Sequence, residues 1–598
     1  MIHLIVGHRG AGKTSLLFAL KDQLKKGRFI DLDTYIEQEE QIKITDIFKK
    51  GEDFFRQLEI SHLNNLVSKF YDSTTDTYVA VGAGFVGNPP KGTHTIWLRR
   101  LTDRIGRSFL DRPRLCKIQS SIEEYLYLFE EREKRYTQWA DEIIERPEGL
   151  KNSLCLGEKL FWGLENPVVG GVLTLMPHFL RSEYTANQYL KKRLDWKKVM
   201  FELRDDLLSS EQIKMACRII PYQRRIASLR KSPQISLACS IAQLWDWALE
   251  LGLPPKGENP PLISQHSRNG QSLDMILDHL NHVEKKWRFS TFKLAVEINN
   301  FKELETGHQW WSANPQCRVF LPRSSNGRWS WYRQLIGQKM NLNFWREGPG
   351  SATDQPTLSE WLTSSDKWEK FAAVLGDPIR HSWTPVEQSS YFAQRKMPVV
   401  AIQMSEEDLS ERTLQFLGEL GLAAAAITSP LKVKATSVVS HHNQSVKEVN
   451  SANTLVLQKN GKWALYNTDR DGLKALLQGV TTKADVAVWG GGGTRKVLRE
   501  LLPRARFYSA RTGELLDGSH NLNFQPSILI WAVGRSRQST SKWPNKKWTP
   551  QLIIDLNYTS DSPGIEYAEK CGAQYKTGEH MFKAQAAAQR KIWDTLKW

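Results

Sequence analysis

The sequence of 598 residues predicts an α/β protein with several domains. Three observations lead to this prediction. An apolar run at 2–6 comes directly before the glycine-rich motif 7–14, and an amphipathic run follows at 16–24. Strand-like and helix-like runs then alternate between residues 168 and 321, which is typical of a parallel sheet or barrel. A second strand–glycine–helix pattern occupies residues 486–502.

The composition argues against several classes of protein. The net charge of +17 would suit a nucleic-acid binder, but the basic residues are spread along the chain without zinc-finger spacing, so we expect no nucleic-acid partner. Six widely separated cysteines without a CxxC pair argue against a disulfide framework or a structural zinc. The chain starts directly on a strand-like run and has no membrane-spanning run, so we expect a soluble, cytoplasmic protein.

The motif at residues 7–14 has the GxxxxGK[ST] pattern of a P-loop. Gly7, Gly10 and Gly12 allow backbone N–H groups to close around a triphosphate. Lys13 supplies charge for the β- and γ-phosphates, and the Thr14 hydroxyl can hold Mg²⁺. A chance match in a glycine-rich turn is the alternative. The strand before the motif and the amphipathic run after it favour an ATP or GTP site.

Charged residues follow the P-loop at positions that suit phosphoryl transfer. Asp31 and Asp33 are two residues apart at an expected strand end, so both carboxylates point the same way. One can order Mg²⁺-bound water, and the other can take a proton from an acceptor hydroxyl. Arg56, Arg112 and Arg132 are candidate clamps for an anionic substrate and for ATP. The alternatives are a solvated strand end and ordinary surface arginines.

These motifs, together with Val81-Gly82-Ala83-Gly84, resemble shikimate kinase across residues 1–155. The resemblance implies an α/β P-loop kinase domain with ATP and Mg²⁺ as cofactors, Lys13 and Asp33 as catalytic residues and Thr14 and Asp31 at the metal. It places Arg112 in the lid over ATP. The positions that it implies for shikimate binding are Asp33, Arg56, Gly82, Gly84 and Arg132. We expect a helix over 123–144 to close this region.

In the middle of the chain, Lys293 lies within the apolar run 292–296. Burying a charged lysine is costly, so an apolar setting favours the neutral amine. A neutral amine can attack a ketone and form an imine. The alternative is a lysine at the exposed end of the strand.

Other polar residues in this region also fall at expected strand ends. His266 follows the run 262–265 and can move protons, while Glu202 and Arg204 share one face of another strand. Arg230 follows the run 226–229. Functional groups at the carboxyl ends of successive strands are typical of a (β/α)8 barrel.

This middle region resembles type I 3-dehydroquinate dehydratase over residues 163–362. The resemblance implies a (β/α)8 barrel in which Lys293 forms the Schiff base and His266 is the general acid and base. The positions that it implies for substrate binding are Glu202, Arg204, Arg230, Arg333, Ser351 and Gln355.

Near the C-terminus, four glycines at 490–493 separate the strand-like run 486–489 from the helical run 494–502. A plain flexible turn is one interpretation, but the strand–glycine–helix order favours a dinucleotide site. Arg511 and Thr512 follow the next strand-like run. An arginine at this point suits the 2′-phosphate of NADP better than the 2′-hydroxyl of NAD.

The motifs 376–385, 428–432, 452–454 and 467–472 resemble shikimate dehydrogenase over residues 369–598. The resemblance implies a substrate lobe at 369–475, a Rossmann NADP(H)-binding lobe at 476–580, and a C-terminal helix that returns to the substrate lobe. Lys432 and Asp469 are then the catalytic pair. The positions implied for the substrate are Ser382, Thr384, Thr428, Asn453, Tyr558 and Gln585. Those implied for the cofactor are Gly490, Gly492, Gly493, Arg511 and Thr512.

The three resemblances describe consecutive reactions on one carbon ring, with 3-dehydroquinate, 3-dehydroshikimate and shikimate as substrates. The order of the regions resembles the C-terminal part of the fungal pentafunctional AROM polypeptide. We therefore expect a multifunctional shikimate-pathway enzyme, and a homodimer is compatible with it. The alternatives are a regulator related to the fungal quinate repressor proteins, which senses quinate or shikimate without turnover, and a fusion with one inactive domain.

Overall fold

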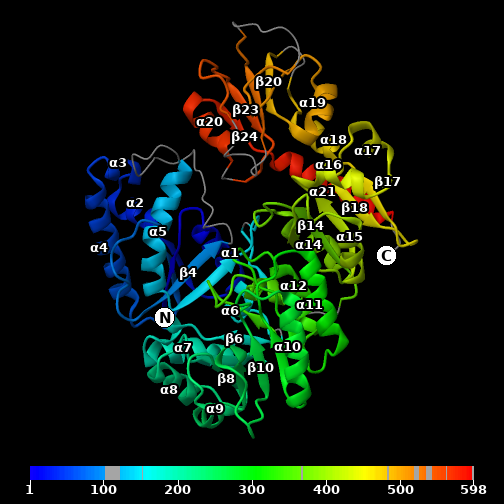
Figure 1. Ribbon diagram of the computed structural model, residues 1–598. Helices are drawn as coiled ribbons and strands as arrows, with labels where there is room; N and C mark the ends of the chain where they lie inside the picture. Colours follow the sequence, from blue (N-terminus) through cyan, green and yellow to red (C-terminus); the bar gives the residue numbers. More distant parts are fainter. Residues whose placement is uncertain are drawn as a thin grey trace. The chain divides into compact units, whose positions relative to one another are not determined.

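The computed structural model describes residues 1–100, 121–150, 152–166, 168–364, 368–480, 484–516, 524–533, 542–559 and 562–595. The described residues up to 100 and from 129 to 364 belong to one compact unit, and residues 121–128 together with those from 368 onwards belong to a second. Figure 1 shows strands and helices alternating along both. The α/β multidomain prediction is therefore confirmed. The predicted domain boundaries stay predictions.

The first sheet has five parallel strands in the order β2-β3-β1-β4-β5. The P-loop motif lies between its central strand and the first helix (Figure 1). The strands are β1 (Ile2–Val6), β2 (Arg28–Asp31), β3 (Thr77–Ala80), β4 (Thr93–Arg100) and β5 (Glu142–Arg146). The helices are α1 (Lys13–Gln23), α2 (Leu32–Glu40), α3 (Ile44–Phe48), α4 (Glu52–Phe70) and α5 (Ser121–Trp139).

The helix expected over 123–144 is wrong at its end. The helix α5 stops at Trp139, and the chain then forms the edge strand β5. Strand β5 pairs in parallel with β4, with Leu98 opposite Ile144. The short apolar pair Ile143–Ile144 fits the helical periodicity of the residues before it. The segment becomes a strand because it pairs with β4, and the local sequence does not encode that pairing.

The second sheet has eight parallel strands in the order β12-β11-β10-β9-β8-β7-β6-β13. They are β6 (Val172–Thr174), β7 (Met200–Arg204), β8 (Arg225–Leu229), β9 (Leu244–Ala248), β10 (Leu262–Gln265), β11 (Thr291–Leu294), β12 (Arg318–Phe320) and β13 (Phe344–Trp345). The helices are α6 (Leu156–Phe161), α7 (Glu183–Leu194), α8 (Ser210–Ile219), α9 (Ile235–Ile241), α10 (Leu273–Lys286), α11 (Phe301–Ala313), α12 (Ser330–Leu335) and α13 (Leu358–Thr363). Sequence periodicity located six of these strands and missed β9 and β13.

A sheet with strands in this order becomes a (β/α)8 barrel when its two end strands, β12 and β13, also meet. The loops after those two strands do meet, because Asp354 accepts hydrogen bonds from the Ser324 backbone N–H at 2.5 Å and from its hydroxyl at 2.8 Å. The Lys293 amine on β11 also lies 5.3 Å from the ring centre of Phe344 on β13. Within the described residues the strand pairing itself stops at β12 and β13, so full closure stays a prediction.

The first two sheets share one hydrophobic core, although the sequence predicted separate domains. Ile143 of β5, Leu160 of α6, Trp345 of β13 and Trp361 of α13 belong to the same cluster of buried side chains. Trp361 also donates an indole hydrogen bond of 2.6 Å to the Val169 carbonyl. The two regions are therefore packed against each other as one unit, consistent with the division of the chain into two units.

The second unit contains a mixed sheet and a parallel sheet (Figure 1). The mixed sheet has the order β15-β14-β16-β18-β19-β17, and the parallel sheet has the order β21-β20-β22-β23-β24. The strands of the mixed sheet are β14 (Phe371–Gly376), β15 (Val399–Gln403), β16 (Leu422–Ile427), β17 (His441–His442), β18 (Thr454–Leu457) and β19 (Trp463–Tyr466). Its helices are α14 (Thr384–Ala393), α15 (Glu411–Glu419), α16 (Leu431–Val438), α17 (Gln444–Val449) and α18 (Asp469–Leu476).

The parallel sheet is doubly wound, and its direction of winding reverses between β20 and β22. Its elements are β20 (Val486–Gly490), α19 (Arg495–Leu501), β21 (Arg506–Tyr508), β22 (Ile528–Ala532), β23 (Leu552–Asp555), α20 (Pro563–Cys571) and β24 (Gln574–Lys576). The last helix, α21 (Glu579–Asp594), packs on the mixed sheet's side of this unit, where Gln589 donates to the Asn453 carbonyl at 3.0 Å. Among the described residues, no helix is long and apolar enough to span a membrane.

The shared core predicts that the first two sheets lose their backbone hydrogen bonds together when the structure opens. Trp361→Ala should lower the free energy of opening of both β1 and β7 by about 3–5 kcal/mol, because it removes a large side chain from a common cluster. Amide hydrogen exchange measured by mass spectrometry on peptides from both strands checks this. Phe289→Ala is the control, because Phe289 is 98% exposed and should change neither strand. Loss of protection in β7 with none in β1 would contradict a shared core.

Candidate functional site

The P-loop is built from a tight turn between β1 and α1. Gly10 and Gly12 have φ angles of +74° and +95°, which residues with a side chain rarely adopt. A Cβ on Gly7 would overlap the Leu98 carbonyl oxygen. The Lys13 amine donates to the carbonyls of Gly7 and His8 at 2.8 and 3.2 Å. The turn therefore has the compact backbone and the lysine that a phosphate-binding loop needs.

Thr14 and Asp31 come together beside this turn. The Thr14 hydroxyl donates a hydrogen bond of 2.7 Å to Asp31. The expectation that Asp31 and Asp33 share one strand end is wrong, because α2 begins at Leu32 and Asp31 is its N-cap. Asp33 lies in the first turn of that helix, next to Gly82. The two carboxylates therefore come from different local structures, and Asp31 is the one that faces the P-loop threonine.

A buried charge cluster lies behind Asp33. Arg56 on α4 donates to Glu59 at 2.6 Å and to Glu52 at 2.9 Å. A Cβ on Gly84 would overlap the Arg56 guanidinium, and one on Gly82 would overlap Glu59.

Glu59 was not assigned a role from the sequence, yet it is fully buried at the centre of this cluster. Burial raises its pKa to about 7, although Arg56 opposes the shift. Arg132 on α5 also lies near Glu59 and is itself buried. The predicted lid residue Arg112 lies outside the described residues.

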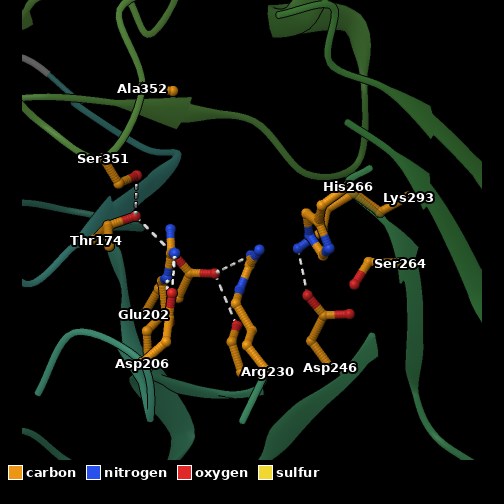
Figure 2. Close-up of polar contacts among 12 residues, drawn as sticks. Thr174, Glu202, Asp206, Arg230, Asp246, Ser264, His266, Lys293, Ser351 and Ala352 are labelled. Carbon is orange, nitrogen blue, oxygen red and sulfur yellow. Dashed lines mark hydrogen bonds and ion pairs between the residues drawn. The ribbon is translucent and has the colours of Figure 1, made fainter. Parts of the chain in front are cut away.

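The Lys293 side chain on β11 is 2% exposed and contacts the Asp246 carboxylate (Figure 2). The expected apolar setting is therefore only partly correct, because a buried carboxylate lies beside the amine. Burial would raise the pKa of Asp246, but Lys293, His266 and Arg230 outweigh it and hold that pKa below its ordinary value. Asp246 was missed because β9 was missed. A single aspartate between two tryptophans in Leu244–Ala248 is the signal that pointed to it.

His266 follows β10 and lies beside Lys293 (Figure 2). Glu250 accepts a hydrogen bond of 2.6 Å from the His266 backbone N–H and lies 3.4 Å from its Nδ1. The other ring nitrogen, Nε2, is buried without a hydrogen-bond partner among the described residues. Burial lowers the pKa of His266 to about 4, even though Glu250 opposes the shift. The ring is therefore neutral at physiological pH and has one nitrogen available to exchange a proton.

Glu202 on β7 organises the other half of the site (Figure 2). It accepts hydrogen bonds from Thr174 at 2.6 Å and from Ser228 at 2.7 Å, and Arg230 lies 3.6 Å away. Burial would raise its pKa, but Lys293, Arg230 and Arg204 outweigh burial and lower the pKa to about 2. Arg204 is itself paired with Asp206, through a hydrogen bond of 2.9 Å. Glu202 therefore stays ionised among several cations.

Three further predicted residues lie around Glu202. The Ser351 hydroxyl lies 3.5 Å from that of Thr174, and the Gln355 side chain accepts hydrogen bonds from the Ser351 and Ala352 backbones at 3.1 and 3.2 Å. Arg333 on α12 is buried, and burial lowers its pKa to about 10. Its Nε has no partner among the described residues. The arrangement has buried N–H donors that can bind a carboxylate.

In the second unit, Lys432 of α16 and Asp469 of α18 form an ion pair, with the amine 2.8 and 2.9 Å from the two carboxylate oxygens. Asn453 donates to the same carboxylate at 2.9 Å, and Gln585 from α21 also donates to it. Ser382 donates to Thr384 at 3.1 Å. Around the Asp469 carboxylate, four predicted residues thus come together from elements that are far apart in the sequence: Lys432, Asn453, Asp469 and Gln585.

Two other residues that were predicted to bind the substrate, Thr428 and Tyr558, lie near Ser382 and Thr384. Thr428 follows β16 and its methyl group packs against Gly376, where a Cβ would overlap it. The Tyr558 ring lies 4.9 Å from that of Trp383 and 4.5 Å from that of Phe582. Both residues therefore border the region that contains Ser382 and Thr384.

The glycine run after β20 lies at the point where the doubly wound sheet reverses direction. Gly490, Gly491 and Gly492 all have positive φ angles, of 90°, 113° and 35°. A Cβ on Gly490 would approach the Ala532 carbonyl oxygen at 2.8 Å, while one on Gly493 would lie 3.9 Å from Cβ of Lys432. This turn therefore lies next to the Lys432–Asp469 pair.

Arg511 and Thr512 are exposed after β21, and their role at a cofactor stays a prediction. The backbone N–H of Thr512 donates to the Ser509 hydroxyl at 3.2 Å, so the turn after β21 is held by a local hydrogen bond. The exposed guanidinium of Arg511 is then available at the end of the strand next to β20.

Comparison with known families agrees with the families predicted for the first and last regions of the chain. Residues 9–155 match the family model for shikimate kinase, and residues 374–455 match the shikimate dehydrogenase substrate binding domain. The chain therefore contains a shikimate kinase domain and a shikimate dehydrogenase domain.

Individual relatives give a similar picture. The shikimate dehydrogenase (NADP(+)) of Prochlorococcus marinus strain MIT 9515 is 24% identical over 260 residues, which cover 37% of this chain and 91% of that protein. The shikimate biosynthesis protein AroDE of Chlamydia pneumoniae is 23% identical over 453 residues, which cover 68% of this chain and 92% of that protein. Among solved structures, shikimate dehydrogenase 1 of Peptoclostridium difficile matches with 20% identity and a TM-score of 0.33, covering 38% of this chain and 93% of that one.

The burial of His266 makes a prediction about its titration. We expect a midpoint near pH 4, and Glu250→Gln should lower it further because the Glu250 carboxylate favours the charged ring. Between about pH 6.5 and 4 the unfolded chain then binds more protons, so this group lowers the stability of the fold as the pH falls through that window. NMR of the ¹³C-labelled imidazole rings, assigned with His266→Gln, measures the midpoint. A midpoint near 6.5 would contradict a buried ring.

Proposed function

We propose that the chain is a trifunctional shikimate-pathway enzyme. It would dehydrate 3-dehydroquinate through a lysine Schiff base, reduce 3-dehydroshikimate with NADPH and phosphorylate shikimate with ATP. The observation that carries the proposal is the group formed by the buried side chains of Lys293, Asp246 and Glu202, which lie on parallel strands, and by His266, which directly follows one of these strands. It stands in the same chain as domains of the kinase and dehydrogenase families.

The lyase step follows from the contacts of Lys293. The amine of Lys293, after it has given up its proton, attacks the C3 ketone, and loss of water leaves an imine that withdraws electrons from C2. His266, which is neutral at physiological pH, accepts the proton from C2. His266 then gives this proton to the C1 hydroxyl, which leaves as water, and hydrolysis of the imine returns the amine. Asp246 contacts the Lys293 amine and orients it, while the buried arginines around Glu202 suit the substrate carboxylate.

One curated relative supports the assignment of the middle region to the same pathway. The match to the shikimate biosynthesis protein AroDE covers 68% of this chain, so it extends beyond residues 369–598 into the middle region. We infer that the eight parallel strands close into a (β/α)8 barrel, because the loops after β12 and β13 are joined by hydrogen bonds to Asp354.

The kinase site fits MgATP. The N–H groups of the turn and the Lys13 amine suit the phosphates, and Thr14 with Asp31 suits Mg²⁺, directly or through water. A bound Mg²⁺ neutralises phosphate charge. Arg56 and Arg132 suit the carboxylate of shikimate, and Asp33 is the candidate acceptor of the hydroxyl proton.

The dehydrogenase site fits NADPH, which supplies hydride when bound. The glycine turn after β20 gives the cofactor's phosphates close access to backbone N–H groups, and Arg511 suits a 2′-phosphate. Lys432 donates a proton to the carbonyl oxygen as it becomes a hydroxyl, and Asp469 holds the amine in place. The Lys293, Lys432 and Lys13 side chains are all present, and this favours the enzyme over a sensor without turnover.

The Schiff base predicts a covalent trap. Sodium borohydride added with 3-dehydroquinate should reduce the imine and attach the ring to Lys293, which mass spectrometry of the digested chain detects. Lys293→Ala should abolish both trapping and dehydration, because no other amine lies at Asp246 among the described contacts of that carboxylate. Lys286→Ala, on the exposed end of α10, is the matched control and should retain both. Trapping that survives Lys293→Ala would exclude Lys293 as the Schiff-base residue.

The three activities predict a coupled reaction. With 3-dehydroquinate, NADPH and MgATP, the chain should produce shikimate 3-phosphate with one NADPH consumed per product. Lys432→Ala should lower the reduction rate by about 10²–10⁴-fold, and Lys13→Ala should lower phosphorylation by about 10²–10³-fold. Absorbance at 340 nm and chromatography of the products measure the two steps separately.

A matched control for the coupled reaction is Lys447→Ala, an exposed lysine on α17, which should leave all three rates unchanged. Loss of one half-reaction in the wild-type chain would identify an inactive domain. Binding of quinate or shikimate without any turnover would favour the regulatory alternative.

A further inference from the structure

The edge strand of the first sheet carries buried charges that the kinase reaction does not use. Strand β5 pairs with β4 alone among the described strands. Its residues Glu142, Glu145 and Arg146 are only 2%, 9% and 0% exposed. Charged side chains at an edge strand normally face water. Here the second region covers the strand and supplies Arg193 to Glu142 and Arg346 to Glu145, in addition to partners from the first region such as Arg99.

The partner segment is the loop 346–357, which follows β13. Its ends are joined by an isolated bridge between Arg346 and Thr357, with hydrogen bonds of 2.9 Å from the Arg346 N–H to the Pro356 carbonyl and 3.2 Å from the Leu358 N–H to the Arg346 carbonyl. Thr357 then caps α13 in a capping box with Glu360. Between these ends the loop carries Ser351 and Gln355, both predicted to bind the lyase substrate.

Glu145 holds the first residue of this loop. The Arg346 Nη1 atom donates to the two Glu145 oxygens at 3.1 and 3.0 Å. The same guanidinium donates through Nε to the Gln355 carbonyl at 2.9 Å and contacts the Gly348 carbonyl. Burial would raise the pKa of Glu145, but Arg346 and Arg99 outweigh it and hold that pKa below its ordinary value. The carboxylate is therefore ionised and binds Arg346 at neutral pH.

From Gln355 the contacts continue into the lyase site. The Gln355 side chain accepts hydrogen bonds from the N–H groups of Ser351 and Ala352. The Ser351 hydroxyl lies 3.5 Å from that of Thr174, which donates to Glu202 at 2.6 Å (Figure 2). An unbroken series of polar contacts thus runs from the first sheet to the centre of the lyase site.

A second set of contacts fixes the neighbouring residues of the loop. Glu347 accepts hydrogen bonds from Arg193 at 2.7 Å and from Tyr189 at 2.6 Å. Arg193 also pairs with Glu142 of β5 at 3.2 Å.

Gly348 lies directly against β5. It has a φ of +63°, and a Cβ at this position would lie 2.9 Å from Ile143. The turn is thus shaped to fit against the strand, and only a glycine can hold it there without strain.

We propose that Glu145, a residue of the kinase region, is a positioning residue for the lyase site. It orients Arg346, and Arg346 holds the backbone of Gln355 where Ser351 and Gln355 meet the substrate. This inference rests on the lyase function proposed above. A buried ion pair of this kind adds little net stability, but removing one partner leaves the other charge uncompensated and strongly destabilises the fold. The test therefore measures the KM of the folded enzyme, which a loss of stability alone does not change.

The test uses Glu145→Gln in the full-length chain. The KM for 3-dehydroquinate should rise about tenfold, because the substrate-binding loop loses its charged anchor. The kcat should stay within about twofold and borohydride trapping at saturating substrate should stay complete, because Lys293, His266 and Asp246 do not touch Glu145. A loss of stability alone would not raise KM in the surviving folded enzyme. An unchanged KM would overturn the proposal.

Glu133→Gln is the matched control. Glu133 binds the other side of Arg99 at 2.9 Å, while Arg99 binds Glu145 at 2.6 Å, so this variant also disturbs Arg99 but leaves Arg346 paired. Its lyase KM should equal that of the wild type. An equal rise in KM for both variants would assign the effect to Arg99 and overturn the proposal.

Arg346→Lys is the second variant, needed if Glu145→Gln does not fold. It keeps a charge opposite Glu145 but loses the second donor that binds Gln355, so the same rise in KM is expected and an unchanged KM overturns the proposal. Wild-type chain that neither dehydrates nor traps would overturn the proposed function and this inference together. Wild-type chain that does both, while the variants keep a normal KM, would overturn only the inference.

Discussion

A charge buried in a protein interior needs an opposite charge beside it, and one central ion pair at each site of the described structure meets this requirement. Lys293 pairs with Asp246 in the second sheet, and Lys432 pairs with Asp469 in the second unit. Arg56 meets Glu59 behind the P-loop. Each lysine or arginine is thereby held in one position, and the groups that contact the substrate are placed before it binds.

The same requirement joins the first two regions. Strand β5 buries three charged residues at the edge of its sheet, and the second region supplies Arg193 and Arg346 as partners. The apolar side chains around these ion pairs belong to one common cluster. The first and second sheets thus share a core, and the loop that carries Ser351 is built against a strand of the kinase region. This arrangement gives a physical reason for keeping both regions in one chain.

Parallel topology explains why residues far apart in sequence meet at the lyase site. Parallel strands that are neighbours in the sheet run in the same direction, so residues within β7 and β11 and residues directly after β8 and β10 come together. Their different surroundings then give them different protonation states. His266 is neutral because burial dominates, while Glu202 is ionised because three cations surround it. One group of neighbouring side chains thereby combines a proton acceptor with a fixed negative charge.

The sequence by itself determined the P-loop, the glycine turn after β20 and most of the charged residues of the three sites, because short motifs and strand periodicity depend on neighbours in the chain. Only the tertiary structure decided that Glu142–Arg146 is a strand, that Asp33 lies in a helix, and that Asp246 and Glu59 lie in buried clusters. Those outcomes depend on pairing and burial between distant segments. A local pattern does not specify which distant strand or charge will lie beside it, and for Glu145 that partner comes from residue 346, two hundred positions further along the chain.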